Sequence, residues 1–476
     1  MSVQFFPTYE QVLRSKFGGL IFDVREYGAD PTGVQDSTAA IQRAADDACL
    51  VEGTIYSPEG MFSLSGPIYV NGSCGFACPG VWQLADGAYP DTASGMTMVV
   101  LGGADATWTI YELHLDGNSA NQTFTNMVAT TYFKGLCADT NNGTTNGCTM
   151  LIPGVLECVN FNTGKANGIG LDVFGCSYGR GNLLVSDNVD TTLWHTAAYT
   201  TTPVDWSWNT VAAHNPSAQV VEIEGASNLS IDQVVHLTDA LPPTGTGADT
   251  LVFETTNSIK NIIIGKARTI NGRYPISGGV GGTGIISDTS IGSFVAQSCR
   301  GSFNLARFDS SCSLSNLIAD GCAVGGVSGA TVHGSFELNG GAEDMLFLHN
   351  PVCINSQNNG IIFLGAATIL GGEVRGSVDT DVAQPTLYAG TIIKNLRGYN
   401  PVGPVAVAVP ASGTATAALP YDATFYITQA TAASSVAVQG QTIAIPVGGP
   451  TAIRVPAGQT LTPTYTTAPT WVVMGD

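Results

Sequence analysis

The segment Glu222-Ile223-Glu224 carries two carboxylates at a spacing that suits acid/base chemistry. Alternate side chains of a β-strand share a face, so Ile223 would point into a core and both glutamates would point outward, roughly 7 Å apart. That separation lies near the boundary between retaining and inverting glycoside hydrolysis, and like charges this close raise the pKa of one partner. The pair is therefore a candidate acid and base; a solvated edge on an acidic protein is the alternative.

Aromatic side chains lie just upstream of this pair. Trp206 and Trp208 are separated by one serine and would share a face of a strand, and Trp194, His195 and Tyr199 are close in sequence. Apolar sugar faces stack on such rings, and a Trp exposed without a partner is costly in water. We predict that these five residues bind substrate. For the Trp pair, packing in the core or between subunits is the alternative.

Other polar motifs point to turns rather than to ligands. The segments 187–190 and 30–36 are rich in Asp and could be metal loops, but capping of turns is the favoured interpretation. The same holds for a set of asparagines expected at turns or in ladders, namely Asn118, Asn228, Asn261, Asn316 and Asn395. We expect no metal and no cofactor.

The cysteines do not form a metal-binding pattern. There are 11 of them, an odd number with no CxxC pair, and the closest spacing, Cys74-x3-Cys78, has no His pair near it. This distribution favours buried small side chains in a protein made in the cytosol over a zinc site.

The composition excludes several classes of function. The 476 residues contain 37 acidic against 17 basic side chains, a formal net charge of −20 that repels nucleic acid and anionic lipid. Hydrophobic residues make up 44% of the chain, enough for a large core. The 58 glycines favour many short strands with tight turns. No apolar run is long enough to span a membrane, and the first residues lack the basic and apolar regions of a secretory signal.

A cap followed by a repeat would position the candidate residues. Residues 1–20 form a short lead, interpreted as an attachment segment. Residues 37–49 are expected to form a helix, capped by Asp36 or Ser37, with Ile41 and three alanines on one apolar face. Short β-rich runs bounded by Asn, Asp, Ser or Gly then recur with a loose period of roughly 20–30 residues and no helical pattern between them.

This repeat indicates a β-solenoid, in which stacked coils bury a continuous core and the open end needs a cap. We assign residues 21–397 to it. Asp232 and Glu254 would then lie on coils next to Glu222 and Glu224, as further catalytic candidates.

The residue composition changes at residue 398. From there to residue 476 the charged side chains are Asp422, Arg454 and Asp476, and strand-like runs occur at 405–409, 424–428, 436–439 and 452–455. We interpret this segment as a small β-sandwich. Three charges are few for a solvated surface, so we expect sibling chains to cover part of it in a trimerisation or tip domain, with a monomeric sandwich solvated by Thr and Ser as the alternative.

Residues 22–42, FDVREYGADPTGVQDSTAAIQ, resemble the N-terminal signature of the pectate-lyase-like superfamily, with Thr32 in place of the usual Asp before the second Gly. Residues 53–70 look like its first coil and 113–118 like a second-coil element. The resemblance implies an all-β, right-handed parallel β-helix with an N-terminal capping helix, followed here by the small C-terminal β-sandwich. It implies no single activity, because the superfamily contains lyases, hydrolases, epimerases and non-catalytic spikes.

Residues 455–471 are similar to the terminal β-domain of phage minor tail proteins and spikes. Together the two resemblances imply a homotrimeric bacteriophage tail spike that is made in the host cytoplasm, assembled with other tail proteins in the virion, and acts on polysaccharide at the host cell surface.

Catalysis remains open at this point. The catalytic motifs of polygalacturonases and of calcium-dependent pectate lyases are not found; His333-Gly334 is a lone fragment. The first hypothesis is a glycan depolymerase, a hydrolase rather than a lyase, using Glu222 and Glu224. The second is a non-catalytic receptor-binding or structural virion protein. The third is a free polysaccharide lyase or glycoside hydrolase.

Overall fold

The structure is a computed structural model of the whole chain. It describes residues 20–91, 95–128, 131–138, 148–165, 167–173, 176–196, 205–224, 227–243, 247–256, 258–280, 282–324, 334–338, 346–383, 391–399, 403–429, 431 and 434–475. The chain divides into two compact units, Met1–Ile285 and Ile286–Asp476, which are taken in turn below. The lead segment, except for Leu20, and Tyr199 and His333 lie outside the described residues.

The first unit begins with the predicted cap. A short 3-10 helix, η1 (Val24–Tyr27), ends at Gly28, whose φ of 95° is accessible mainly to glycine. Helix α2 (Thr38–Leu50) follows and buries Ile41 and several alanines on one face. The Asp36 carboxylate accepts hydrogen bonds from the first helical N–H and from the backbone N–H of Ser65, so the predicted capping role falls to Asp36. Ser37 makes no side-chain cap bond.

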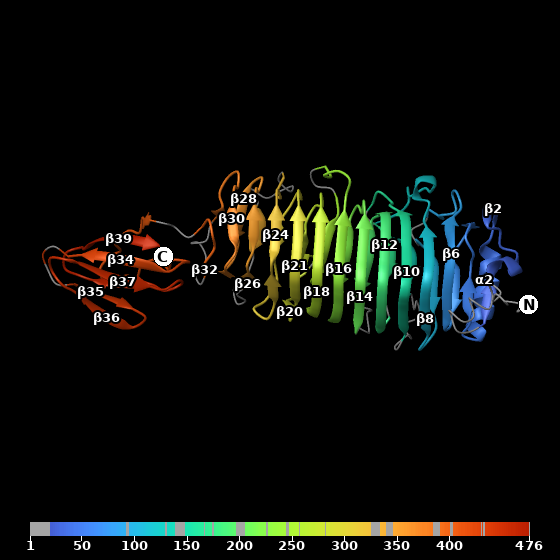
Figure 1. The fold of residues 1–476 in the computed structure, drawn as a ribbon, viewed down its shortest axis with the longest axis horizontal. Helices are drawn as coiled ribbons and strands as arrows, with labels where there is room; N and C mark the ends of the chain where they lie inside the picture. Colours follow the sequence, from blue (N-terminus) through green and yellow to red (C-terminus); the bar gives the residue numbers. More distant parts are fainter. Residues whose placement is uncertain are drawn as a thin grey trace, which may run out of the picture. The chain divides into compact units, whose positions relative to one another are not determined.

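Two parallel sheets run through the coils that follow (Figure 1). The strands of the first sheet are β1 (Ile21–Asp23), β2 (Thr32–Asp36), β3 (Thr54–Tyr56), β4 (Met61–Leu64), β6 (Cys74–Leu84), β8 (Thr107–Asp116), β10 (Thr149–Phe161), β12 (Tyr178–Val189), β14 (Trp206–His214), β16 (Ser227–Leu237) and β18 (Ile259–Ile270). Those of the second sheet are β5 (Ile68–Asn71), β7 (Met96–Gly102), β9 (Phe133–Cys137), β11 (Gly168–Asp172), β13 (Thr191–Thr196), β15 (Gln219–Glu224), β17 (Asp249–Glu254) and β19 (Ile276–Val280).

From β6 onward, each coil contributes a strand to each sheet, and strands of successive coils pair in parallel. For example, β12 pairs with β14 and β14 with β16, while β13 pairs with β15 and β15 with β17. A further 3-10 turn, η2, covers Ser119–Asn121. Apolar side chains of both sheets point into the coil, which gives the continuous interior that the repeat predicted.

Trp206 and Trp208 belong to this interior. Each is 1% exposed, and their indole rings stack with centroids 5.9 Å apart. On the preceding coil, Gly179 and Gly181 pair in register with them and leave room for the rings. A Cβ at Gly181 would lie 1.9 Å from an atom of the Trp208 ring. The residue pattern thus places both indoles inside the coil.

We expect Gly181→Ala to lower the free energy of unfolding by about 1–3 kcal/mol, because the added methyl group overpacks the interior against Trp208. Urea unfolding of the variant and the wild type measures the effect. Gly66→Ala is the matched control, since a Cβ there has open space around it. Equal stability of the Gly181→Ala variant and the wild type would contradict this packing.

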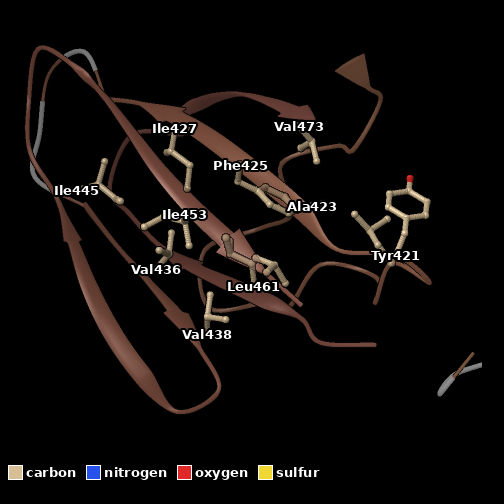
Figure 2. Packing of buried hydrophobic residues seen from close by; sticks show 12 residues of the cluster. Tyr421, Ala423, Phe425, Ile427, Val436, Val438, Ile445, Ile453, Leu461 and Val473 are labelled. Carbon is tan, nitrogen blue, oxygen red and sulfur yellow. The ribbon is translucent and has the colours of Figure 1, made fainter. Parts of the chain in front are cut away.

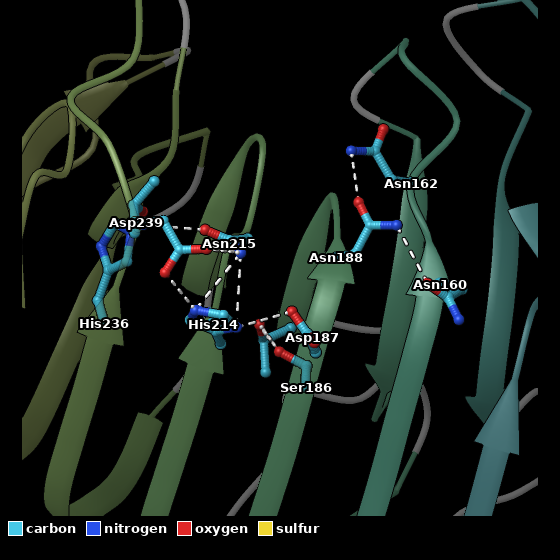
Figure 3. A network of polar contacts seen from close by, with 11 residues as sticks. Asn160, Asn162, Ser186, Asp187, Asn188, His214, Asn215, His236 and Asp239 are labelled. Carbon is cyan, nitrogen blue, oxygen red and sulfur yellow. Dashed lines mark hydrogen bonds and ion pairs between the residues drawn. The ribbon is translucent and has the colours of Figure 1, made fainter. Parts of the chain in front are cut away.

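Asparagines at positive φ turn the chain at the ends of strands. The five asparagines assigned to turns or ladders all have φ between 49° and 59°, which confirms that assignment. They are Asn118, Asn228, Asn261, Asn316 and Asn395. Figure 3 shows such a ladder, in which Asn188 Nδ2 donates to Asn160 Oδ1 at 3.2 Å. In the same view His214 bridges three successive coils by contacting Asp187 and Asp239, each at 3.0 Å. These side chains stabilise the coil edge.

The two Asp-rich segments also serve turns. The Asp30 carboxylate accepts the backbone N–H groups of Thr32 and Gln35. The buried Asp190 carboxylate accepts those of Thr163 and Gly168. The favoured interpretation as turn-capping segments is therefore confirmed.

The second unit begins with further parallel coils. One set of strands is β20 (Ile286–Ser287), β21 (Ser290–Gln297), β23 (Ser313–Ser315), β24 (Leu317–Asp320), β26 (Leu346–His349), β27 (Val352–Ile354), β29 (Ala367–Leu370), β30 (Glu373–Arg375) and β32 (Ile392–Lys394). The other set is β22 (Phe303–Asn304), β25 (Gly334–Leu338), β28 (Asn359–Phe363) and β31 (Val382–Ala383). Within each set the pairing is parallel.

The second unit ends in two antiparallel sheets. One has the strand order β33 (Gly403–Val405), β39 (Thr470–Gly475), β34 (Ala423–Thr428) and β37 (Pro450–Val455). The other has the order β36 (Gln441–Ile445), β35 (Ser434–Val438) and β38 (Leu461–Thr464). Their facing side chains, among them Phe425, Val436 and Leu461, form one buried cluster (Figure 2).

The predicted fold class, a right-handed parallel β-helix with a capping helix and a small C-terminal β-sandwich, is confirmed. One strand-like run was wrong: only Val405 of residues 405–409 lies in a strand. The Val407 carbonyl instead accepts a hydrogen bond from Trp471 Nε1 at 2.7 Å. The boundary at 397/398 stays a prediction; the last parallel strand ends at Lys394 and the first antiparallel strand begins at Gly403.

The cysteines are free, and all but Cys49 are buried, as expected of small apolar side chains. In the part of the chain that the structure describes, no helix has the length and apolar character needed to span a membrane.

Candidate active site on the second sheet of the first unit

A small pocket lies over the second sheet of the first unit and contains the predicted glutamate pair. Its volume is about 250 Å³. The lining residues are Tyr132, Asn167, Ile169, Thr191, Trp194, Gln219, Glu222, Glu224 and Glu254. They come from successive coils, so the pocket is a product of stacking and not of any single loop.

The register of the strands explains why these carboxylates meet. Trp194 on β13 pairs with Glu222 on β15, and Glu224 on β15 pairs with Glu254 on β17. Neighbouring strands lie roughly 4.8 Å apart, so residues paired in this way have adjacent side chains. Ile223, between the two glutamates, is buried as expected. The prediction that Glu254 lies on a coil next to the pair is confirmed.

The environment of Glu222 favours its neutral form. Burial raises the pKa of Glu222 to about 9, and a hydrogen bond to Glu254 and the charges of Glu254, Glu224 and Asp172 act in the same direction. Burial and the charge of Glu254 also raise the pKa of Glu224 above its usual value. At neutral pH the pocket therefore holds a protonated carboxyl that can donate a proton, next to carboxylates that can accept one.

An ion pair with two aromatic rings borders the carboxylates. Lys134 Nζ donates to Asp172 Oδ2 at 2.6 Å, and Asp172 is only 2% exposed. The same ammonium lies 5.4 Å from the ring centre of Tyr132 and 5.8 Å from that of Trp194. The two rings are 4.7 Å apart at an angle of 58°. This arrangement fixes Trp194 at the edge of the pocket, where the predicted binding role can be exercised.

Sequence reasoning missed Tyr132, Lys134 and Asp172. Lys134 and Asp172 lie on β9 and β11, whose inward residues Leu136 and Leu171 pair with each other, as Leu193 pairs with Val221 further along the sheet. Aligning these apolar residues coil by coil would have predicted that Tyr132, Lys134 and Asp172 lie close to the glutamates. Their irregular spacing in the sequence hides that register.

The structure corrects the placement of several predicted residues. Asp232 lies on β16 in the first sheet and is exposed, so it does not share the pocket with Glu222. Trp206 and Trp208 are core residues, the alternative interpretation given above, and offer no face for a sugar. His195 is fully buried edge-on to Trp206, and burial lowers its pKa to about 3. Tyr199 lies outside the described residues.

The structure was also searched for a metal site within the described part of the chain. Among those residues no group of three or more His, Cys, Asp and Glu side chains could hold an ion.

A protein-family model matches the chain up to the strand that carries Glu222 and Glu224. Residues 21–218 match the family model described as rhamnogalacturonase A/epimerase, pectate lyase-like. This region is a pectate-lyase-like domain, as the N-terminal signature indicated. The match includes Tyr132, Lys134 and Trp194 and ends just before β15, so the three glutamates follow it. A comparison with curated proteins found no match.

Two solved structures illustrate what the chain is similar to. The Dettilon tailspike protein is 12% identical over 96% of this chain and 94% of its own, with a TM-score of 0.48. The A-module of the mannuronan C-5 epimerase AlgE6 of Azotobacter vinelandii is 15% identical over 80% of this chain and 100% of its own, with a TM-score of 0.46.

Proposed function

We propose that the protein binds a polysaccharide across the second sheet of its first unit and cleaves it by acid/base hydrolysis. The observation that carries the proposal is the cluster of Glu222, Glu224 and Glu254 in one pocket with Trp194, where burial raises the pKa of Glu222 to about 9. Glu222 donates a proton to the leaving oxygen, and Glu224 activates a water or attacks the sugar carbon. The pectate-lyase-like match supports a carbohydrate as the substrate class.

Trp194 supplies the stacking surface in this proposal. Its ring contacts Tyr132 and lies near the Lys134 ammonium, and Trp194 pairs in register with Glu222, so a sugar stacked on it would present its glycosidic oxygen near the acid. A pocket of about 250 Å³ suits one sugar unit of a longer chain lying across the coils.

The proposed setting is a bacteriophage tail spike that acts on polysaccharide at the host cell surface as a homotrimer. The similarity of residues 455–471 to phage tail domains supports this setting. Exposed apolar side chains on the C-terminal sandwich support it too. Tyr426 and Val472 pair on neighbouring strands and remain 43% and 52% exposed, whereas the charges of Asp422 and Arg454 pair with each other at 3.0 Å. A monomer by light scattering would contradict the trimer.

The test of the activity is incubation of the purified protein with bacterial capsule and cell-wall polysaccharides. New reducing ends without unsaturated sugars are expected. Ultraviolet absorbance of unsaturated products would indicate a lyase and contradict the mechanism. Binding without any product would leave a non-catalytic receptor-binding protein instead.

A further inference from the structure

The pocket carries a strongly one-sided charge. Three of its described lining residues are glutamates, of which Glu222 is held neutral at neutral pH, and none of the lining residues is Lys, Arg or His. An incoming substrate therefore meets a negative potential.

The nearby cation does not offset this potential for a ligand. Lys134 donates to the buried Asp172 carboxylate at 2.6 Å and lies close to two aromatic rings. Recruiting its ammonium for a substrate would leave Asp172, at 2% exposure, without its counter-ion. The ion pair neutralises itself, and the negative charge of the glutamates stays uncompensated.

We infer that the sugar unit bound in this pocket carries no acidic group, so the substrate is a polysaccharide of neutral or amino sugars at the cleavage site and not a polyuronate. This inference rests on the proposed function and names its substrate class. A uronate carboxylate bound in this pocket would lie near Glu224 and Glu254, and juxtaposed like charges in an interface disfavour binding strongly.

The same charge pattern disfavours β-elimination. That reaction removes the proton next to a uronate carboxylate and needs a cation to stabilise the negative charge that develops there. The described lining residues include no Lys, Arg or His, and the Lys134 ammonium donates to Asp172. Hydrolysis needs the proton from Glu222, a water and the carboxylate of Glu224 as base or nucleophile, so it is compatible with the site.

The experiment compares matched polysaccharides that differ only in the carboxyl group. Polygalacturonate and polymannuronate are each tested against the same polymer reduced at C6 to the neutral sugar, with chitosan as a cationic probe. Binding is measured by titration calorimetry, with and without calcium. We expect each reduced polymer to bind at least about tenfold more tightly than its acidic parent, and chitosan to bind more tightly than either acidic polymer.

Variants tie the preference to the pocket. Glu224→Gln combined with Glu254→Gln should shrink the difference within each pair, whereas Asp232→Asn, on the other sheet, should leave it unchanged. A polyuronate bound or cleaved as well as its reduced partner, with or without calcium, would overturn the inference and leave the proposed hydrolase in place. Absence of both binding and cleavage for every polymer, including the bacterial polysaccharides above, would overturn the proposed function itself.

Discussion

Replacing Glu222 with glutamine is expected to lower the rate of glycan cleavage by about 10²–10⁴-fold, the range that a general acid contributes. Glutamine keeps the shape and the hydrogen-bonding capacity of a protonated glutamate but cannot give up a proton to the leaving oxygen. Because burial and neighbouring carboxylates raise the pKa of Glu222 to about 9, the wild type keeps this acid through neutral pH. Reducing-end assays on the cleaved polysaccharide measure the loss.

The pH dependence of the wild type gives a second readout of the same group. An acid with a pKa of about 9 must be protonated to act, so the cleavage rate should decline as the pH rises through that value. Glu254→Gln removes one neighbouring charge that keeps Glu222 protonated, and the decline should begin at lower pH. Asp232→Asn is the control and should match the wild type. Full activity of Glu222→Gln would remove the acid/base assignment.

Much of the fold could be predicted from residue patterns within short stretches of the sequence. The cap helix could be predicted because Ile41 and the alanines recur on one face after a side chain able to cap it. The outward orientation of Glu222 and Glu224 could be predicted because alternation along a strand is strict and Ile223 lies between them.

The predictions that were wrong or missing depend on contacts between coils, which patterns within one short stretch of sequence do not show. Alternation correctly placed Trp206 and Trp208 on one face, but which face points inward depends on the neighbouring coil. Gly179 and Gly181, a full coil earlier in the chain, open the space that makes the interior favourable for both indoles. The ion pair of Lys134 with Asp172 was not predicted for the same reason, since the two residues meet only through the register between coils.

The free energy of unfolding should fall as the pH is raised from about 5 to about 9, and Glu222 should be a principal cause. The unfolded chain releases this proton near the ordinary glutamate pKa of 4.5, whereas the folded chain holds it up to about 9. Between these values the unfolded state binds fewer protons than the folded state, so stability decreases with rising pH, by about 1.4 kcal/mol per pH unit for one group. Urea unfolding at several pH values measures this slope.

Glu222→Gln should remove that contribution, because glutamine does not ionise in either state. The variant should match the wild type in stability near pH 5 and exceed it increasingly toward pH 9, while Asp232→Asn should keep the wild-type slope. Identical slopes for the wild type and Glu222→Gln would show that the carboxyl is not held neutral by its surroundings. Glu222→Gln should therefore raise stability at alkaline pH while it lowers the cleavage rate. That combination is expected of a group kept in an unfavourable environment for its chemistry, because replacing a residue retained only for the fold would lower the stability of the protein.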